Sequence, residues 1–226
     1  MTKSKPADIF LIAGGPNSKN TKAILAHALA LIKKKAPNVA YIGTASDDDK
    51  EFFLMLKPII MAAGAGSVRL VPIVRRFDPD KAKDILLSSD VVFISGGDVD
   101  LGMKYLRKRK LVPFFRELYD RGKLFCGISA GAIMLCRNWM HWRDPDDDDT
   151  AELLDCLGFA PLLCDVHAEE DNWVEMKRLL GFFPQGTAGY GIPAEGALRV
   201  APDGKITSIG SAPLQFIKQG ADIIII

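Results

Sequence analysis

The sequence predicts an α/β fold of three layers, in which helices cover both faces of a mostly parallel central sheet. Over the first two thirds of the 226 residues, short apolar runs alternate with longer amphipathic stretches. This alternation is typical of βαβ units. The last third has closely spaced short apolar runs and an Asp203-Gly204 turn, which predict a small antiparallel extension of the sheet.

The individual elements follow in order from this pattern. Apolar runs predict strands at 8–13, 39–43, 67–74, 91–95 and 124–128. Amphipathic stretches predict helices at 21–35, 48–63, 79–88 and 101–120, the last one broken at Pro113. Four short strands are expected at 190–192, 197–200, 206–209 and 214–218. The terminal isoleucines 223–226 are expected to be buried, either as an edge strand or at the contact of a homodimer.

Length and composition favour one domain spanning residues 1–226, because 48% hydrophobic residues suffice for one substantial core. The formal net charge is +1, so the chain lacks the large field that would bind nucleic acid or an anionic membrane. No apolar run is long enough to span a membrane, and Met1 is not followed by the apolar region of a signal peptide. We therefore expect a cytoplasmic protein that binds a small molecule.

Neither a metal nor a cofactor is expected. The four cysteines show no metal-binding spacing, and most lie in apolar segments, as is typical of reduced, buried thiols. The acidic run 144–149 lacks the glycine and the spacing of a calcium loop. It is interpreted as a solvated loop that caps a helix beginning at Thr150.

The segment 127–131 reads Gly-Ile-Ser-Ala-Gly and directly follows an apolar strand. This is the G-x-S-x-G pattern of a nucleophile elbow, a sharp turn between a strand and a helix that exposes the serine hydroxyl. Ser129 is therefore the candidate nucleophile. The N–H of Ala130, at the start of the following helix, is a candidate donor to an oxyanion.

A serine needs a general base, and the chain contains three histidines. His27 lies inside a predicted helix, and His141 lies past the elbow helix with no predicted strand to position it. His167 follows an apolar run, so it is expected at the same sheet edge as Ser129 and is the preferred base.

A carboxylate should orient the imidazole, and several are near in sequence: Asp144, Asp165, Glu169 and Glu170. The residues alone do not choose among them. A second oxyanion donor is expected from the glycine turn after the strand 91–95, and we select the N–H of Gly97.

Four segments together resemble peptidase family S51, the aspartyl dipeptidases (peptidase E) and cyanophycinases. They are Phe-Ile-Ser-Gly-Gly-Asp at 93–98, Gly-Ile-Ser-Ala-Gly-Ala at 127–132, His167, and Gly-Tyr-Gly-Ile-Pro-Ala-Glu-Gly-Ala-Leu at 189–198. The resemblance implies a fold like the class I glutamine amidotransferases and a Ser-His-acid triad. It implies Ser129 as nucleophile, His167 as base, and the N–H groups of Gly97 and Ala130 as the oxyanion hole.

The resemblance leaves two candidates for the acid. Spacing within the family implies Asp144, in the loop after the elbow helix. The amidotransferases instead place the acid two residues after the histidine, and here that residue is Glu169. We favour Asp144.

We therefore expect a serine hydrolase that cleaves a small peptide or isopeptide bond, in a substrate like an aspartyl dipeptide or cyanophycin. The alternative is an amidase, or a non-catalytic binding module that keeps an amidotransferase-like scaffold.

Overall fold

The computed structural model describes residues 6–144 and 146–226. Residues 1–5 and Pro145 lie outside this range. The expectations for the N-terminal segment and for the acidic run 144–149 therefore fall partly outside the described residues. In the described residues no helix is long and apolar enough to cross a membrane.

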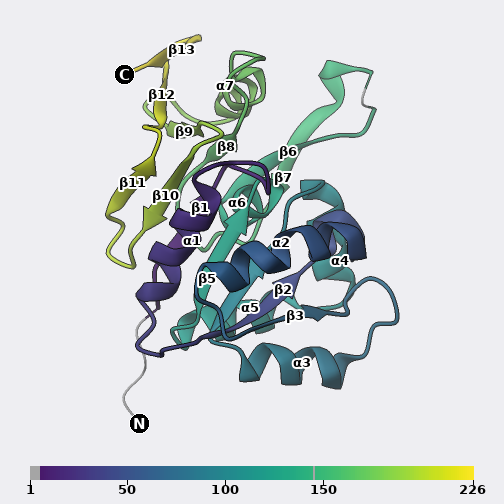
Figure 1. Ribbon diagram of the computed structural model, residues 1–226. Coiled ribbons are helices and arrows are strands. Elements are labelled where there is room, and N and C mark those ends of the chain that lie inside the picture. The colour runs from purple at the N-terminus through teal and green to yellow at the C-terminus, as the bar shows by residue number, and fades with distance from the viewer. Residues whose placement is uncertain (1–5, 145) are drawn as a thin grey trace.

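A sheet of seven strands forms the centre of the described structure, in the order β11-β10-β1-β5-β4-β2-β3 (Figure 1). Its parallel part consists of β1 (Ile9–Ile12), β5 (Leu124–Ile128), β4 (Val91–Ile94), β2 (Asn38–Ile42) and β3 (Ser67–Val71). At one edge β10 (Gly196–Val200) and β11 (Ile206–Gly210) run antiparallel. The predicted mostly parallel sheet is confirmed.

Helices cover both faces of this sheet, as the sequence predicts. Alternate residues of β1 point to opposite sides, so Phe10 and Ile12 pack in one core cluster while Ile9 and Leu11 pack in the other. On the first side lie α1 (Thr21–Ala30) and α2 (Lys50–Ala62). On the second lie α3 (Pro79–Ser88), α4 (Val99–Lys108), α5 (Val112–Asp120) and α6 (Ala130–Leu135). A short 3-10 helix, η1 (Thr44–Ser46), contacts α4.

A second, four-stranded sheet lies beside the central one, in the order β13-β12-β9-β8. It consists of β8 (Cys164–Val166), β9 (Ala188–Ile192), β12 (Leu214–Gln219) and β13 (Asp222–Ile225), and α7 (Val174–Gly181) packs against it. The predicted C-terminal strands are therefore present, but they divide between two sheets.

The terminal isoleucines contribute to an edge strand, as expected, but pairing within the chain does not bury them, so only the expected burial at a subunit contact stays a prediction. The exposed fractions of Ile224, Ile225 and Ile226 are 38%, 50% and 64%. The reason is that β13 is the outermost strand of its sheet and pairs with β12 on one side.

A β-hairpin replaces the helix that was expected from Thr150. In it β6 (Asn138–Trp142) pairs with β7 (Ala151–Asp155), and the short 3-10 helix η2 (Asp148–Thr150) precedes β7. Trp139 lies opposite Leu154, and Met140 lies opposite Leu153. These cross-strand pairs of large apolar side chains favour strands over the predicted helix.

Candidate active site

Ser129 lies at the sharp turn between β5 and α6, with φ 53° and ψ −125°. A residue other than glycine rarely adopts positive φ, so this turn is strained. Both flanking glycines are required by close backbone contacts. A Cβ at Gly127 would lie 2.2 Å from the carbonyl oxygen of Gly131, and a Cβ at Gly131 would lie 2.2 Å from that of Ile94. The predicted strand–turn–helix geometry of a nucleophile elbow is present.

Ser129 and His167 are in contact: the serine Oγ lies 2.8 Å from Nε2 of the imidazole. The backbone fixes both residues, because Ser129 N donates to Ile12 O at 2.8 Å and His167 N donates to Ile192 O at 2.9 Å. The expectation that both belong to one sheet edge is wrong. His167 follows β8 of the second sheet, and Ser129 follows β5 of the central sheet. The two sheets together bring the side chains within hydrogen-bonding distance.

This contact is of the kind that activates a serine. When Nε2 of His167 is unprotonated, it accepts the hydrogen bond from the hydroxyl and can take its proton as the oxygen attacks. The neutral ring then carries its proton on Nδ1.

Among the residues that the structure describes, neither candidate acid forms a hydrogen bond or an ion pair with His167. Asp144 is exposed on the β6–β7 connection, where its Oδ1 accepts from Asp146 N at 3.1 Å. Glu169 accepts from Ala194 N at 2.8 Å through its Oε1. Both carboxylates are thus engaged by backbone N–H groups, which corrects the geometric expectation for Asp144 and for Glu169.

The two residues expected to supply oxyanion donors, Gly97 and Ala130, both lie at the cavity of Ser129. Gly97 has φ +134° and its Cβ would lie 2.0 Å from Ala45 O, so this turn requires glycine. Within the described chain, no backbone hydrogen bond occupies the N–H of Gly97 or that of Ala130. Both can donate to a developing negative charge.

The other two histidines lie in different surroundings. His27 packs edge-on against the ring of Phe10. His141, which was expected to lack a strand, lies on β6 and lines the cavity. Its Nδ1 is 3.4 Å from a carboxylate oxygen of Asp100.

The cavity that contains Ser129 and His167 has a volume of about 780 Å³. Its apolar lining includes Ile133, Trp139 and Trp142. The charged side chains that line it are mainly carboxylates: Asp98, Asp100, Asp165, Asp171 and Glu175, together with Arg178. Burial raises the pKa of Asp165 to about 7, and the negative charges of Glu175 and Asp171 add to this effect.

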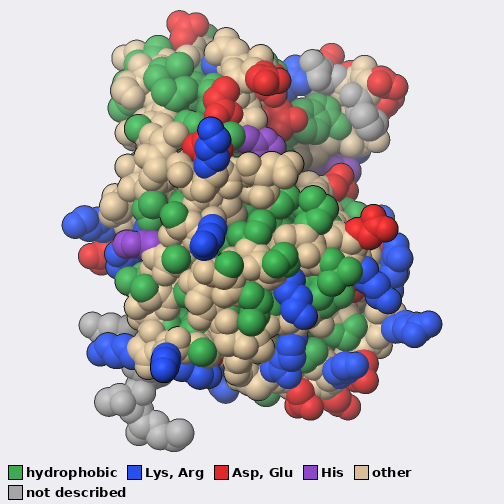
Figure 2. Space-filling model, viewed as in Figure 1, with side chains coloured by type: hydrophobic (Ala, Val, Ile, Leu, Met, Phe, Trp, Pro, Cys, Tyr) green, Lys and Arg blue, Asp and Glu red, His purple; other side chains and the backbone are tan. Residues whose placement is uncertain are grey.

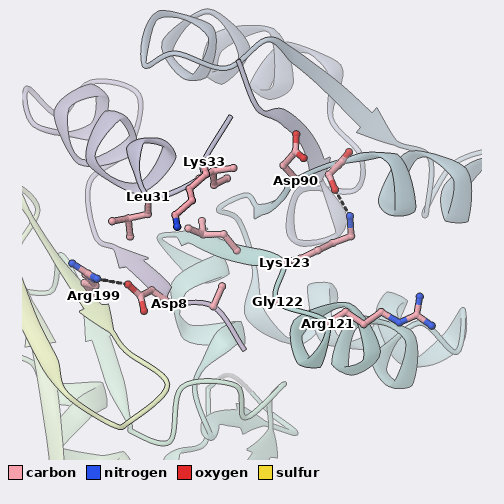
Figure 3. Close-up of a pocket in the computed structure, with 12 residues that line it drawn as sticks. Asp8, Leu31, Lys33, Asp90, Arg121, Gly122, Lys123 and Arg199 are labelled. Atoms are coloured by element: carbon pink, nitrogen blue, oxygen red, sulfur yellow. Dashed lines mark hydrogen bonds and ion pairs between the residues drawn. The ribbon is translucent and has the colours of Figure 1, made fainter. Parts of the chain in front are cut away.

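A second hollow of about 610 Å³ lies near Asp8, Asp90 and Lys123, beside the amino ends of β1, β4 and β5 (Figure 3). Figure 3 shows Arg199 directed toward Asp8, and these two form an ion pair at 2.5 Å. Lys123 Nζ donates to the carbonyl oxygen of Leu87 at 2.9 Å. Ser129 and His167 do not line this hollow, so it is not the candidate active site.

Known proteins resemble this chain in family and in fold. The model of Peptidase family S51 matches residues 9–208. The crystal structure of a peptidase from an acI-B1 Actinobacterium has a TM-score of 0.74 at 18% identity, covering 98% of this chain and 94% of that one. A putative peptidase E protein from Listeria monocytogenes EGD-e gives 0.68 at 16% identity, covering 92% of this chain and 100% of that one. A search of curated proteins gives no significant match. At these identities the two structures establish a shared fold.

Sequence reasoning does not single out the acidic lining of the cavity. It offers Asp165 only as one of several neighbouring carboxylates, and it passes over Asp171 and Glu175. A signal is present, since acidic residues recur between β8 and the first turn of α7. Which of them face the cavity depends on the turn at 169–173 and on the placement of α7.

Proposed function

Since the chain belongs to peptidase family S51, we propose that it is a serine peptidase with Ser129 as nucleophile and His167 as general base. One observation carries this proposal: the 2.8 Å contact between Ser129 Oγ and His167 Nε2 at a strained elbow. A serine hydroxyl is a weak nucleophile until such a base takes its proton.

The reaction follows from this arrangement. Ser129 Oγ attacks the carbonyl carbon of the scissile bond while His167 accepts the hydroxyl proton. The N–H groups of Gly97 and Ala130 donate to the oxygen that becomes negative. His167 then gives its proton to the leaving amine, and an acyl-enzyme remains on Ser129. A water molecule, deprotonated by His167, attacks this ester and releases the acyl product.

The substrate is a small peptide or isopeptide. The cavity of about 780 Å³ is of a size typical for small-molecule sites. The resemblance to aspartyl dipeptidases and cyanophycinases, and the likeness to a putative peptidase E, support this class of substrate.

The proposal is tested with a panel of dipeptides and β-aspartyl isopeptides, with release of the free amine as the readout. Ser129→Ala should lower turnover of any substrate found by about a million-fold, as is typical when a triad nucleophile is removed. Ser208→Ala is a matched control, because Ser208 is exposed on β11, and its turnover should equal that of the wild type. Turnover by Ser129→Ala at the wild-type rate would refute the role of Ser129.

A further inference from the structure

The segment between β8 and α7 carries His167 and then turns sharply, and we call residues 168–173 the 168–173 turn. Three residues in or next to this turn have positive φ: His167 at 46°, Asn172 at 56° and Trp173 at 59°. This conformation is unfavourable for residues other than glycine, and it persists only where surrounding contacts fix it. The contacts of the turn therefore bear on the position of His167.

Trp173 fixes the far end of the turn in the core. Its exposed fraction is 3%, and its ring packs against Phe216 with the ring centroids 6.1 Å apart. Its backbone N–H donates to the carbonyl oxygen of Ala168 at 3.0 Å, which closes the turn on the residue next to His167. The ring also fills the space beside β9, where a Cβ at Gly191 would lie 2.7 Å from Trp173 Cε3.

Glu169 ties the start of the turn to the loop after β9. Its Oε1 accepts from Ala194 N at 2.8 Å, and His167 N donates to Ile192 O at 2.9 Å. Both hydrogen bonds join the same two segments, because Ile192 ends β9 and Ala194 lies two residues further on. An ionised carboxylate is a strong acceptor for such an N–H group. The backbone of His167 is thus held from both sides.

The direction of the His167 side chain depends on this backbone. Among the described residues the imidazole makes one hydrogen bond, to Ser129 Oγ, so no carboxylate orients it there. Figure 2 shows a histidine at the surface beside acidic side chains in the upper part of the molecule, where Figure 1 places β8 and α7. An exposed ring without a second partner keeps its direction through the backbone that carries it.

We propose that Glu169 and Trp173 are positioning residues for His167, which hold the 168–173 turn and thereby keep Nε2 within reach of Ser129 Oγ. This inference rests on the proposed peptidase function. Both residues act through the backbone of His167. A displacement of about 1 Å in a catalytic group can lower a rate about a hundredfold, so loosening the turn should slow the reaction of Ser129.

Labelling of Ser129 by a serine-reactive fluorophosphonate tests the inference without a known substrate. Glu169→Ala removes one anchor and leaves the core closed, because this side chain is exposed. The labelling rate should fall about tenfold to a hundredfold, while the midpoint of urea unfolding stays close to that of the wild type. A merely structural role of Glu169 would shift the urea midpoint and leave the labelling rate of the folded protein unchanged.

Two further variants isolate the contact that Glu169 makes. Glu169→Gln keeps an oxygen that accepts from Ala194 N, so it should restore the labelling rate to within about threefold of the wild type. Glu51→Ala makes the same change as Glu169→Ala at an exposed residue in the first turn of α2. It is the control and should be labelled at the wild-type rate.

Gly191→Ala tests the second anchor, because the new Cβ would displace the ring of Trp173. Labelling of the folded variant should slow as in Glu169→Ala, and backbone amides of the 168–173 turn should exchange hydrogen faster in both variants. Gly189→Ala on the same strand is the matched control. Its Cβ would lie 2.4 Å from the sulfur of Met176, which belongs to a flexible side chain that can move aside.

A wild-type labelling rate in Glu169→Ala, or in folded Gly191→Ala, would overturn the inference. Equally slow labelling in Glu169→Gln and Glu169→Ala would also overturn it, because the charge of Glu169 would then act as the acid of the triad. An unlabelled Ser129 in the folded wild type would refute the proposed function and the inference with it. Labelling that depends on His167 but not on Glu169 would refute the inference alone.

Discussion

The backbone at Ser129 holds the hydroxyl in position for the proposed reaction. Its φ of 53° is sterically unfavourable for serine, and the turn is held by the hydrogen bond from Ser129 N to Ile12 O and by the glycine contacts on both sides. Strain of this kind persists only when the surrounding structure fixes the residue. Here it aims the hydroxyl at the imidazole of His167.

Amide substitution tests whether Asp144 or Glu169 acts as the acid that orients His167. Asp144→Asn and Glu169→Gln each keep an oxygen that can accept from the backbone, at Asp146 N and Ala194 N. Because neither carboxylate reaches His167 in the structure, both variants should keep kcat within about tenfold of the wild type. Loss of a true triad acid would instead lower kcat by about four orders of magnitude, as it does in chymotrypsin-like enzymes. Such a loss in either variant would identify it as the third member.

Asp165 should also make the stability of the fold depend on pH. Its pKa is raised from 3.8 to about 7 in the folded state, so the folded chain binds this proton more tightly than the unfolded chain. Stability is therefore lost as pH rises from about 4 to about 7. At about 1.4 kcal/mol per pH unit, the loss is at most about 4 kcal/mol.

Urea unfolding of the wild type and of Asp165→Asn at pH 4 and pH 8 measures this effect. The variant should gain stability relative to the wild type at the higher pH. Asp203→Asn, in an exposed turn, should follow the wild type. Parallel pH curves for Asp165→Asn and the wild type would contradict the raised pKa.

At the scale of elements, the close approach of α6 to β4 depends on Gly131. A Cβ there would lie 2.2 Å from Ile94 O, which is backbone and cannot move aside alone. Gly131→Ala should therefore lower the free energy of unfolding by about 3 kcal/mol and displace Ser129, with loss of activity. Gly181→Ala in α7, which meets nothing within 4 Å, should be neutral or slightly stabilising. Equal urea midpoints for Gly131→Ala and the wild type would contradict this account.

The elements that the sequence predicts best are those with a clear period or a clear turn. The strands and helices up to α6 follow from apolar alternation, and the strand–turn–helix around Ser129 follows from its two glycines. The predicted helix break at Pro113 is wrong: the break lies at 109–111, and Pro113 is in the first turn of α5, where a proline is tolerated. The β6–β7 hairpin escapes prediction because its connection is an acidic run that also fits a helix N-terminus. Its pairing depends on contacts between residues far apart in the sequence, such as Trp139 with Leu154.

At the scale of the whole molecule, the site depends on the packing of two sheets. The sequence indicates that Ser129 and His167 each follow a strand, but not that these strands belong to different sheets. For the same reason, the sequence could not tell that Asp144 and Glu169 make no hydrogen bond to His167 in the described structure, because the tertiary arrangement of the loops decides which groups meet the imidazole. A single domain and a cytoplasmic location stay predictions.

The expected homodimer can be tested at the exposed edge strand β13. An exposed apolar edge offers unpaired backbone groups to a second copy, and Ile225 is 50% exposed. Sedimentation velocity over a range of concentrations should show self-association of the wild type that Ile225→Lys weakens. Identical monomers for both proteins at every concentration would contradict it.

Covalent labelling tests the central claim, that His167 activates Ser129 as a nucleophile, most directly. The protein would be incubated with a serine-reactive fluorophosphonate, and the modified residue would be located by peptide mass spectrometry. We expect one label on Ser129 in the wild type, none in Ser129→Ala and a much slower reaction in His167→Ala, because the hydroxyl then loses its base. An unlabelled Ser129 in the folded wild type, or a labelling rate that His167→Ala leaves unchanged, would contradict the account and favour a non-catalytic binding module.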